Sequence, residues 1–198
     1  MMNKKILFSF LVTFFILTTK SDCQFFITPY IGLDRINFQN LPLQPAGTIK
    51  FHFLFGLNLE KKIGKKIGLE YGLMCSESNH KFSNGDSPGS QDFRLSQNFI
   101  HNNVSLKYSI FEKLFLGGGL NLRNSVSSER ENLNTGIIDS NIENSRSLGL
   151  LTYLELDQYK FSLRIYNIFR IDNNEMEGRE PVSYYGLTLG YNISIGSR

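Results

Sequence analysis

The chain has 198 residues, enough for one domain, and its 20% of charged residues argue against disorder. The formal net charge of +3 nearly vanishes without the basic N-terminal leader, so the sequence gives no reason to expect nucleic acid as a partner. The two cysteines, Cys23 and Cys75, show no spacing typical of zinc ligands, and we assign no metal site.

The N-terminus has the three parts of a secretory signal peptide. A basic start precedes an apolar run over residues 6–17, and Ser21 and Cys23 occupy the −3 and −1 positions of a cleavage site. The alternative is a membrane anchor, but the run has about 12–14 apolar residues and a spanning helix needs ~20. The pattern therefore predicts a signal peptide over 1–23, export through Sec, and a mature domain over 24–198.

Apolar side chains recur at every second position along the rest of the chain, which is typical of β-strands. The pattern is clearest in the hairpin over 51–75, where Phe53 and Leu69 share one face and Asn58 and Glu70 share the other. In chain order, this pattern predicts strands at about 26–38, 51–59, 67–75, 93–110, 114–123, 148–156, 161–170 and 184–195.

The links between these strands alternate in length. The short links are 60–66, 111–113 and 157–160, and the long polar ones are 39–48, 76–92, 124–144 and 171–181. Outer-membrane barrels have short periplasmic turns, longer outer loops and an even number of strands. We therefore predict an all-β fold: an eight-stranded antiparallel up-and-down transmembrane β-barrel in a bacterial outer membrane. Its expected partners are outer-membrane lipid and the barrel-assembly machinery.

The distribution of charge between the two strand faces separates this prediction from an alternative. The charged residues share the face that carries the glycines: Asp34, Glu70, Lys107, Arg123, Glu155, Arg164 and Arg170. In a membrane barrel this face lines the lumen, whereas in a soluble secreted lipocalin-like barrel that binds a ligand it would meet water. The leader, the alternating links and the aromatic residues near the strand ends favour the membrane barrel.

An eight-stranded barrel is narrow, so side chains fill its interior. We predict a polar network in the lumen in which Glu70 and Glu155 pair with Lys107, Arg123 and Arg164. The alternative is a water-filled lumen in which the same charges are merely solvated.

A second class of function is a lipid-modifying enzyme similar to outer-membrane deacylases and acyltransferases. His80 and Ser83, near Glu77, lie in the polar segment 76–92 and would supply its Ser-His-acid group. The deacylase pattern, with His and Ser two apart on a strand, is not matched, so a solvated loop explains these residues better and we assign no catalytic residue.

Two further sets of residues are candidate ligand sites. His52 and His101 fall on lumen-facing positions, where hydrogen-bonded interior histidines are expected. Asp86 and Asp92 suggest calcium, but the turn signal Asn84-Gly85-Asp86 explains them without metal. No cofactor is expected.

Several stretches resemble the outer-membrane β-barrel domain family of Bacteroidetes, the PorT-like group. They are the signal ending before Gln24, the hairpin through Leu69-Glu70-Tyr71-Gly72-Leu73, and the final strand Tyr185-Gly186-Leu187-Thr188-Leu189-Gly190-Tyr191. The resemblance implies an eight-stranded outer-membrane barrel, in a group associated with protein secretion. The chain departs from barrels that end on an aromatic residue, because it ends in Ile195-Gly196-Ser197-Arg198.

Outer loops usually carry recognition in small barrels. The sequence therefore predicts a non-enzymatic structural or binding barrel, or one that serves protein secretion, with a protein partner contacted through residues 76–92 and 124–144.

Overall fold

The computed structural model describes residues 25–37, 51–63, 65–82, 92–140, 146–171 and 183–195. The predicted signal peptide, 1–23, lies outside these residues, as do the expected loop 39–48 and most of 171–181. The strands are β1 (Phe25–Asn37), β2 (His52–Ile63), β3 (Ile67–Phe82), β4 (Phe93–Phe111), β5 (Leu114–Asn132), β6 (Ile138–Asp139), β7 (Arg146–Gln158), β8 (Phe161–Arg170), β9 (Ser183–Tyr191) and β10 (Ile193–Ile195).

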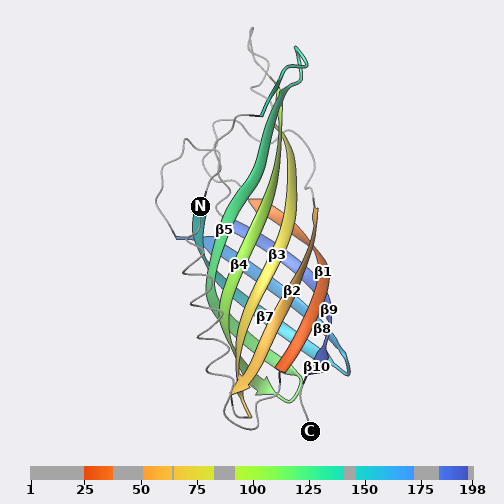
Figure 1. Cartoon of the computed structure of the whole chain (residues 1–198), viewed down its shortest axis with the longest axis vertical. Coiled ribbons are helices and arrows are strands. Elements are labelled where there is room, and N and C mark those ends of the chain that lie inside the picture. The colour runs from red at the N-terminus through yellow and green to blue at the C-terminus, as the bar shows by residue number, and fades with distance from the viewer. Residues whose placement is uncertain are drawn as a thin grey trace.

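The strands form a closed antiparallel barrel (Figure 1). Each barrel strand pairs with its neighbours in chain order, and β1 pairs with β9 over Tyr30–Asn37 and with β10 over Phe25–Ile27, which joins the two edges. β9 and β10 are two parts of the last strand, separated at Asn192, and β6 pairs only with β5 among the described residues. The prediction of an eight-stranded up-and-down barrel is confirmed.

The barrel is apolar outside and polar inside. Large hydrophobic side chains on the wall are exposed, among them Phe53 at 82% and Leu189 at 50%, whereas Glu70 and Lys107 are at most 3% exposed. A soluble barrel would have the opposite arrangement, so the lipocalin-like alternative is wrong. Charged groups on the lipid side of such a wall are destabilising, which explains why the strands sort their charges inward.

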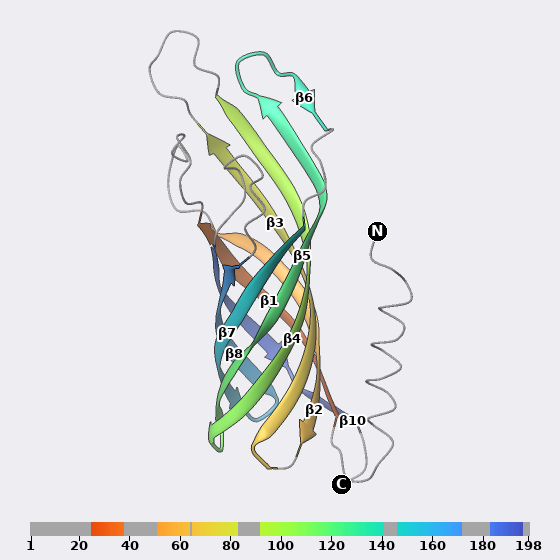
Figure 2. The ribbon, with the colours of Figure 1, turned by 90° about the vertical axis from the view of Figure 1, so that its left-hand side faces the viewer.

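The prediction of strand ends was wrong at the outer end of the barrel, which is the end opposite the short links. β3 continues to Phe82 and β5 continues to Asn132, although both segments were expected to be loops. Among the described residues, β3 pairs with β4 as far as Phe82↔Phe93, whereas its pairing with β2 stops at Ser76↔Leu54. Figure 2 shows β3, β4 and β5 rising beyond the other strands, with β6 beside β5.

The described residues hold no helix of the length and hydrophobicity that a bilayer crossing requires.

Candidate functional site

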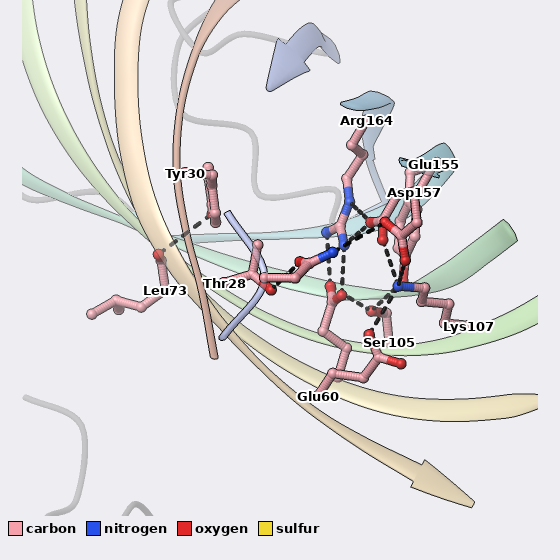
Figure 3. Close-up of polar contacts among 12 residues, drawn as sticks. Thr28, Tyr30, Glu60, Leu73, Ser105, Lys107, Glu155, Asp157 and Arg164 are labelled. Atoms are coloured by element: carbon pink, nitrogen blue, oxygen red, sulfur yellow. Dashed lines mark hydrogen bonds and ion pairs between the residues drawn. The ribbon is translucent and has the colours of Figure 1, made fainter. Parts of the chain in front are cut away.

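An ionic cluster fills the half of the lumen nearer the short turns. Its members come from β2, β3, β4, β7 and β8, and we call it the ionic plug: Glu60, Glu70, Lys107, Glu155, Asp157 and Arg164. Figure 3 shows Glu60, Lys107, Glu155 and Arg164 pointing toward one another from four different strands. Alternation along each strand places these side chains inside, so the plug follows from the same pattern that makes the wall apolar.

Arg164 joins two of the three glutamates of the plug, Glu70 and Glu155. Its Nη1 donates to Glu70 Oε1 at 2.7 Å, its Nη2 donates to Glu70 Oε2 at 2.5 Å, and its Nε donates to Glu155 Oε2 at 2.6 Å. The flat guanidinium fork matches a carboxylate in this two-bonded arrangement. The guanidinium carbon also lies 4.0 Å from the centre of the Tyr153 ring, which adds a cation–π contact.

Lys107 is the second cation of the plug. Its Nζ donates to Glu60 Oε2 at 2.8 Å and to Glu155 Oε1, and it lies 3.7 Å from Asp157 Oδ2. Its ammonium group therefore neutralises carboxylates from β2 and β7, while Phe115 covers it at 4.4 Å from the ring centre. Because Glu155 contacts both cations, it connects the Lys107 part of the plug with the Arg164 part.

The lumen is densely packed where glycines of the wall face interior tyrosines. A Cβ atom added to Gly117 would lie 2.0 Å from Cζ of Tyr153, and one added to Gly186 would lie 2.2 Å from Cζ of Tyr166. Glycines on the lumen face therefore make room for interior tyrosines. A small cavity of about 20 Å³ lies beside Arg164 and Tyr166, which is space for about one water molecule.

Four of the five predicted network residues lie in the plug, and Arg123 does not. Its guanidinium carbon lies 4.8 Å from the ring centre of Phe99 and 5.1 Å from that of Tyr184. Glu155 pairs with Phe115 of β5, eight positions before Arg123, or ~26 Å along the strand at ~3.3 Å per residue. Arg123 therefore lies far from Glu155, and its guanidinium stacks on aromatic rings.

Sequence reasoning missed two members of the plug. Glu60 and Asp157 were placed in short turns, but the structure keeps both within strands. Glu60 follows Asn58 by two positions, and Asp157 follows Glu155 by two, so both continue the lumen-facing parity of their strands. The two-residue spacing from a lumen-facing residue therefore predicts both positions, although the charges of these segments are also typical of turns.

The three histidines all face the lumen, as predicted for His52 and His101. His101 Nε2 lies 3.1 Å from Ser76 Oγ, and its Nδ1 lies 3.3 Å from Asn121 Nδ2. The placement of His80 in a loop is wrong, because it is a buried residue of β3 with its Nε2 3.1 Å from His52 Nε2.

The geometry does not assemble the expected Ser-His-acid group. His80 points into the lumen, whereas Glu77, three positions away on the same strand, is exposed on the opposite face. Ser83, the hydroxyl of the enzyme hypothesis, lies outside the described residues. Asp86, one of the two residues of the calcium hypothesis, lies outside them as well. Within the described ranges, no group of three or more His, Cys, Asp or Glu side chains is arranged to hold a metal ion.

The closed barrel, its apolar exterior and its ionic interior are those of an outer-membrane barrel, and the protein is located in the bacterial outer membrane.

No family model and no curated protein matches the chain. Among solved structures, the chain is similar to Ail, the attachment invasion locus protein of Yersinia pestis, in complex with the heparin analogue sucrose octasulfate. The identity is 14%, the TM-score is 0.49, and 87% of this chain and 100% of that chain are covered. Neisserial surface protein A gives 12% identity and a TM-score of 0.48, with 88% and 100% coverage. These similarities say nothing about a ligand or partner of this chain. The evidence for the barrel fold is the pairing of its own strands.

Proposed function

We propose that the protein is a non-enzymatic surface barrel that binds a protein partner through the protruding sheet formed by β3, β4 and β5. The observation that carries this proposal is the continued pairing of these strands beyond the barrel. Residues 77–82 of β3 pair with 93–98 of β4, which in turn pair with 127–132 of β5.

Side-chain contacts hold this sheet in one arrangement. Arg94 Nη1 donates to Glu131 Oε2 at 2.9 Å, and Asn98 Nδ2 donates to Ser127 Oγ at 2.8 Å, both across the β4–β5 pair. A preorganised surface loses less conformational entropy on binding than a loop does. Its exposed face carries polar and charged groups such as Glu77 and Lys81, which suits a partner in water rather than lipid.

The ionic plug supports a role in binding rather than in transport. Its Arg164–Glu70 pair joins opposite walls across a narrow lumen, so a small solute would have to displace ion pairs to pass. The buried position of His80 against His52 also supports a non-enzymatic barrel. If the chain shares the role associated with the PorT-like group that it resembles, its partner is a component of a protein-secretion machinery.

Site-specific photo-crosslinking in intact cells tests the binding proposal. A photoreactive p-benzoyl-phenylalanine is introduced at Ser96, in a second variant at its cross-strand neighbour Asn79, and as a control at lipid-facing Leu116. We expect a discrete protein adduct from position 96 and none from position 116. If neither position 96 nor position 79 gives an adduct, the sheet is not a binding surface.

A further inference from the structure

His52 and His80 form an imidazole pair at the outer end of the lumen. His52 is the first residue of β2, and His80 lies two positions before the end of β3. Both side chains are about nine-tenths buried, at 7% exposure each. Their Nε2 atoms are 3.1 Å apart, their ring centres are 4.7 Å apart, and the ring planes are inclined by 58°.

In the absence of metal, the two Nε2 atoms lie within hydrogen-bond distance of each other, and the same two distances fit two imidazoles that bind one metal ion. With metal–nitrogen bonds of ~2.05 Å, nitrogens 3.1 Å apart subtend an angle of about 98° at the metal. The same construction places the ring centres ~4.8 Å apart, close to the 4.7 Å observed. A linear hydrogen bond between the rings at the same nitrogen separation would place the centres ~5.4 Å apart. The two rings are therefore not collinear, as two imidazoles bound to one ion would also not be.

A buried carboxyl group lies next to the pair. Asp34 is the cross-strand neighbour of His52 in the β1–β2 ladder, and its side chain is fully buried. Neither of its carboxyl oxygens has a hydrogen-bond partner among the described residues. A carboxyl group beside metal-bound imidazoles favours a cation and can accept from a ligand or from metal-bound water.

The third histidine differs from this pair. Both ring nitrogens of His101 lie within hydrogen-bond distance of polar side chains, Ser76 and Asn121. Its ring also packs edge-on against Tyr184, with the centres 5.5 Å apart. His101 is therefore a matched control, because it is a buried lumen histidine with no second imidazole facing it.

We infer that His52 and His80 form a two-imidazole site for a divalent transition-metal ion at the outer end of the lumen. Imidazole is a good ligand for Cu²⁺, Ni²⁺ and Zn²⁺, and a given nitrogen site generally binds Cu²⁺ more tightly than the other two ions. No third His, Cys, Asp or Glu of the described ranges joins the two imidazoles, so these ranges supply two protein ligands. Such a site binds metal exchangeably, unlike a closed structural zinc site with four protein ligands.

The test is a titration of the folded full-length chain in detergent with Cu²⁺, followed by calorimetry and electron paramagnetic resonance. We expect one equivalent to bind, with nitrogen superhyperfine splitting from two imidazoles. Affinity should fall as pH decreases from 7.5 to 5.5, because protons compete for the ring nitrogens. Zn²⁺ should compete for the same site.

Three variants separate this site from metal bound elsewhere. We expect His52→Gln and His80→Gln each to weaken binding at least tenfold and to reduce the coupled nitrogens from two to one, whereas His101→Gln changes affinity less than twofold. The shift in mobility of the unboiled protein on a detergent gel verifies that each variant is folded. The inference is wrong if the wild-type chain binds no Cu²⁺, or if its spectrum lacks two coupled nitrogens. These two readouts need no variant to fold. It is equally wrong if both glutamine variants bind as tightly as the wild type.

Discussion

Arg164 donates to both carboxylate oxygens of Glu70, at 2.7 and 2.5 Å, although the two residues are 94 positions apart in the chain. They lie on β3 and β8, which are not neighbours in the sheet, so this contact crosses the lumen. The contact therefore joins opposite walls of the barrel, and its loss should affect stability more than the loss of a contact within one wall.

Replacing Glu70 tests this relationship. We expect Glu70→Gln to lower the free energy of unfolding by about 3–5 kcal/mol, because it removes one of the two carboxylates that neutralise a buried guanidinium. Urea titration of the folded barrel in lipid vesicles, followed by the gel shift of unboiled samples, measures the change.

Glu131→Gln is the matched control, because Glu131 also pairs with an arginine, at 2.9 Å, but both side chains are about one-third exposed. An exposed pair contributes at most about 1 kcal/mol. Equal costs for the two substitutions would contradict the view that burial makes the Glu70 contact important.

The parts of the fold that the sequence predicts are those within the membrane. There, each strand alternates between lipid and lumen, so Leu189 and Lys107 could be assigned to opposite faces without coordinates. Beyond the membrane this contrast disappears, because both faces of β3 and β5 are polar. Alternation therefore predicts loops where the structure has strands that end at Phe82 and Asn132.

The partners inside the lumen depend on information that alternation does not contain. Which charges meet across the barrel is set by the stagger of strands that are not neighbours. Alternation therefore predicts that Arg123 faces the lumen. It does not predict that Arg123 stacks on Phe99 and Tyr184, well away from Glu155. By contrast, Glu60 could have been found from the parity of Asn58 alone.

Two adjacent glycines of β5 should respond differently to the same substitution. A Cβ on Gly117 would lie 2.0 Å from the Tyr153 ring in the lumen, whereas one on Gly118 would meet only Leu151 O, at 3.6 Å. We expect Gly117→Ala to lower the free energy of unfolding by about 1–3 kcal/mol through overpacking, and Gly118→Ala to change it little. The same urea titration measures both, and a Gly117→Ala barrel as stable as the wild type would show that the lumen is loosely packed.

A charge introduced on the wall tests which face meets lipid. Leu187 lies in the middle of β9 with 46% of its surface exposed. We expect Leu187→Arg to destabilise the barrel by about 2–4 kcal/mol in lipid vesicles, the cost of a cation near the bilayer midplane. Tyr159→Arg, in the short turn before β8 and 90% exposed, should cost little by comparison. A neutral effect of Leu187→Arg would mean that this face is in water.

The ionic plug predicts that the wild-type barrel does not conduct ions. In planar bilayers containing KCl we expect no stable current steps, because Lys107 and Arg164 close the lumen through shared contacts with Glu155. The double variant Lys107→Ser with Glu155→Ser removes one cation and one carboxylate together, so it shortens two buried side chains without changing the net charge.

We expect this variant to show discrete current steps. The corresponding change at the protruding sheet, Arg94→Ser with Glu131→Ser, should remain silent because that ion pair lies outside the lumen. Current steps from the wild-type barrel at the same salt concentration would mean that the lumen is a water-filled path, and that the charges of the plug are solvated rather than packed against one another.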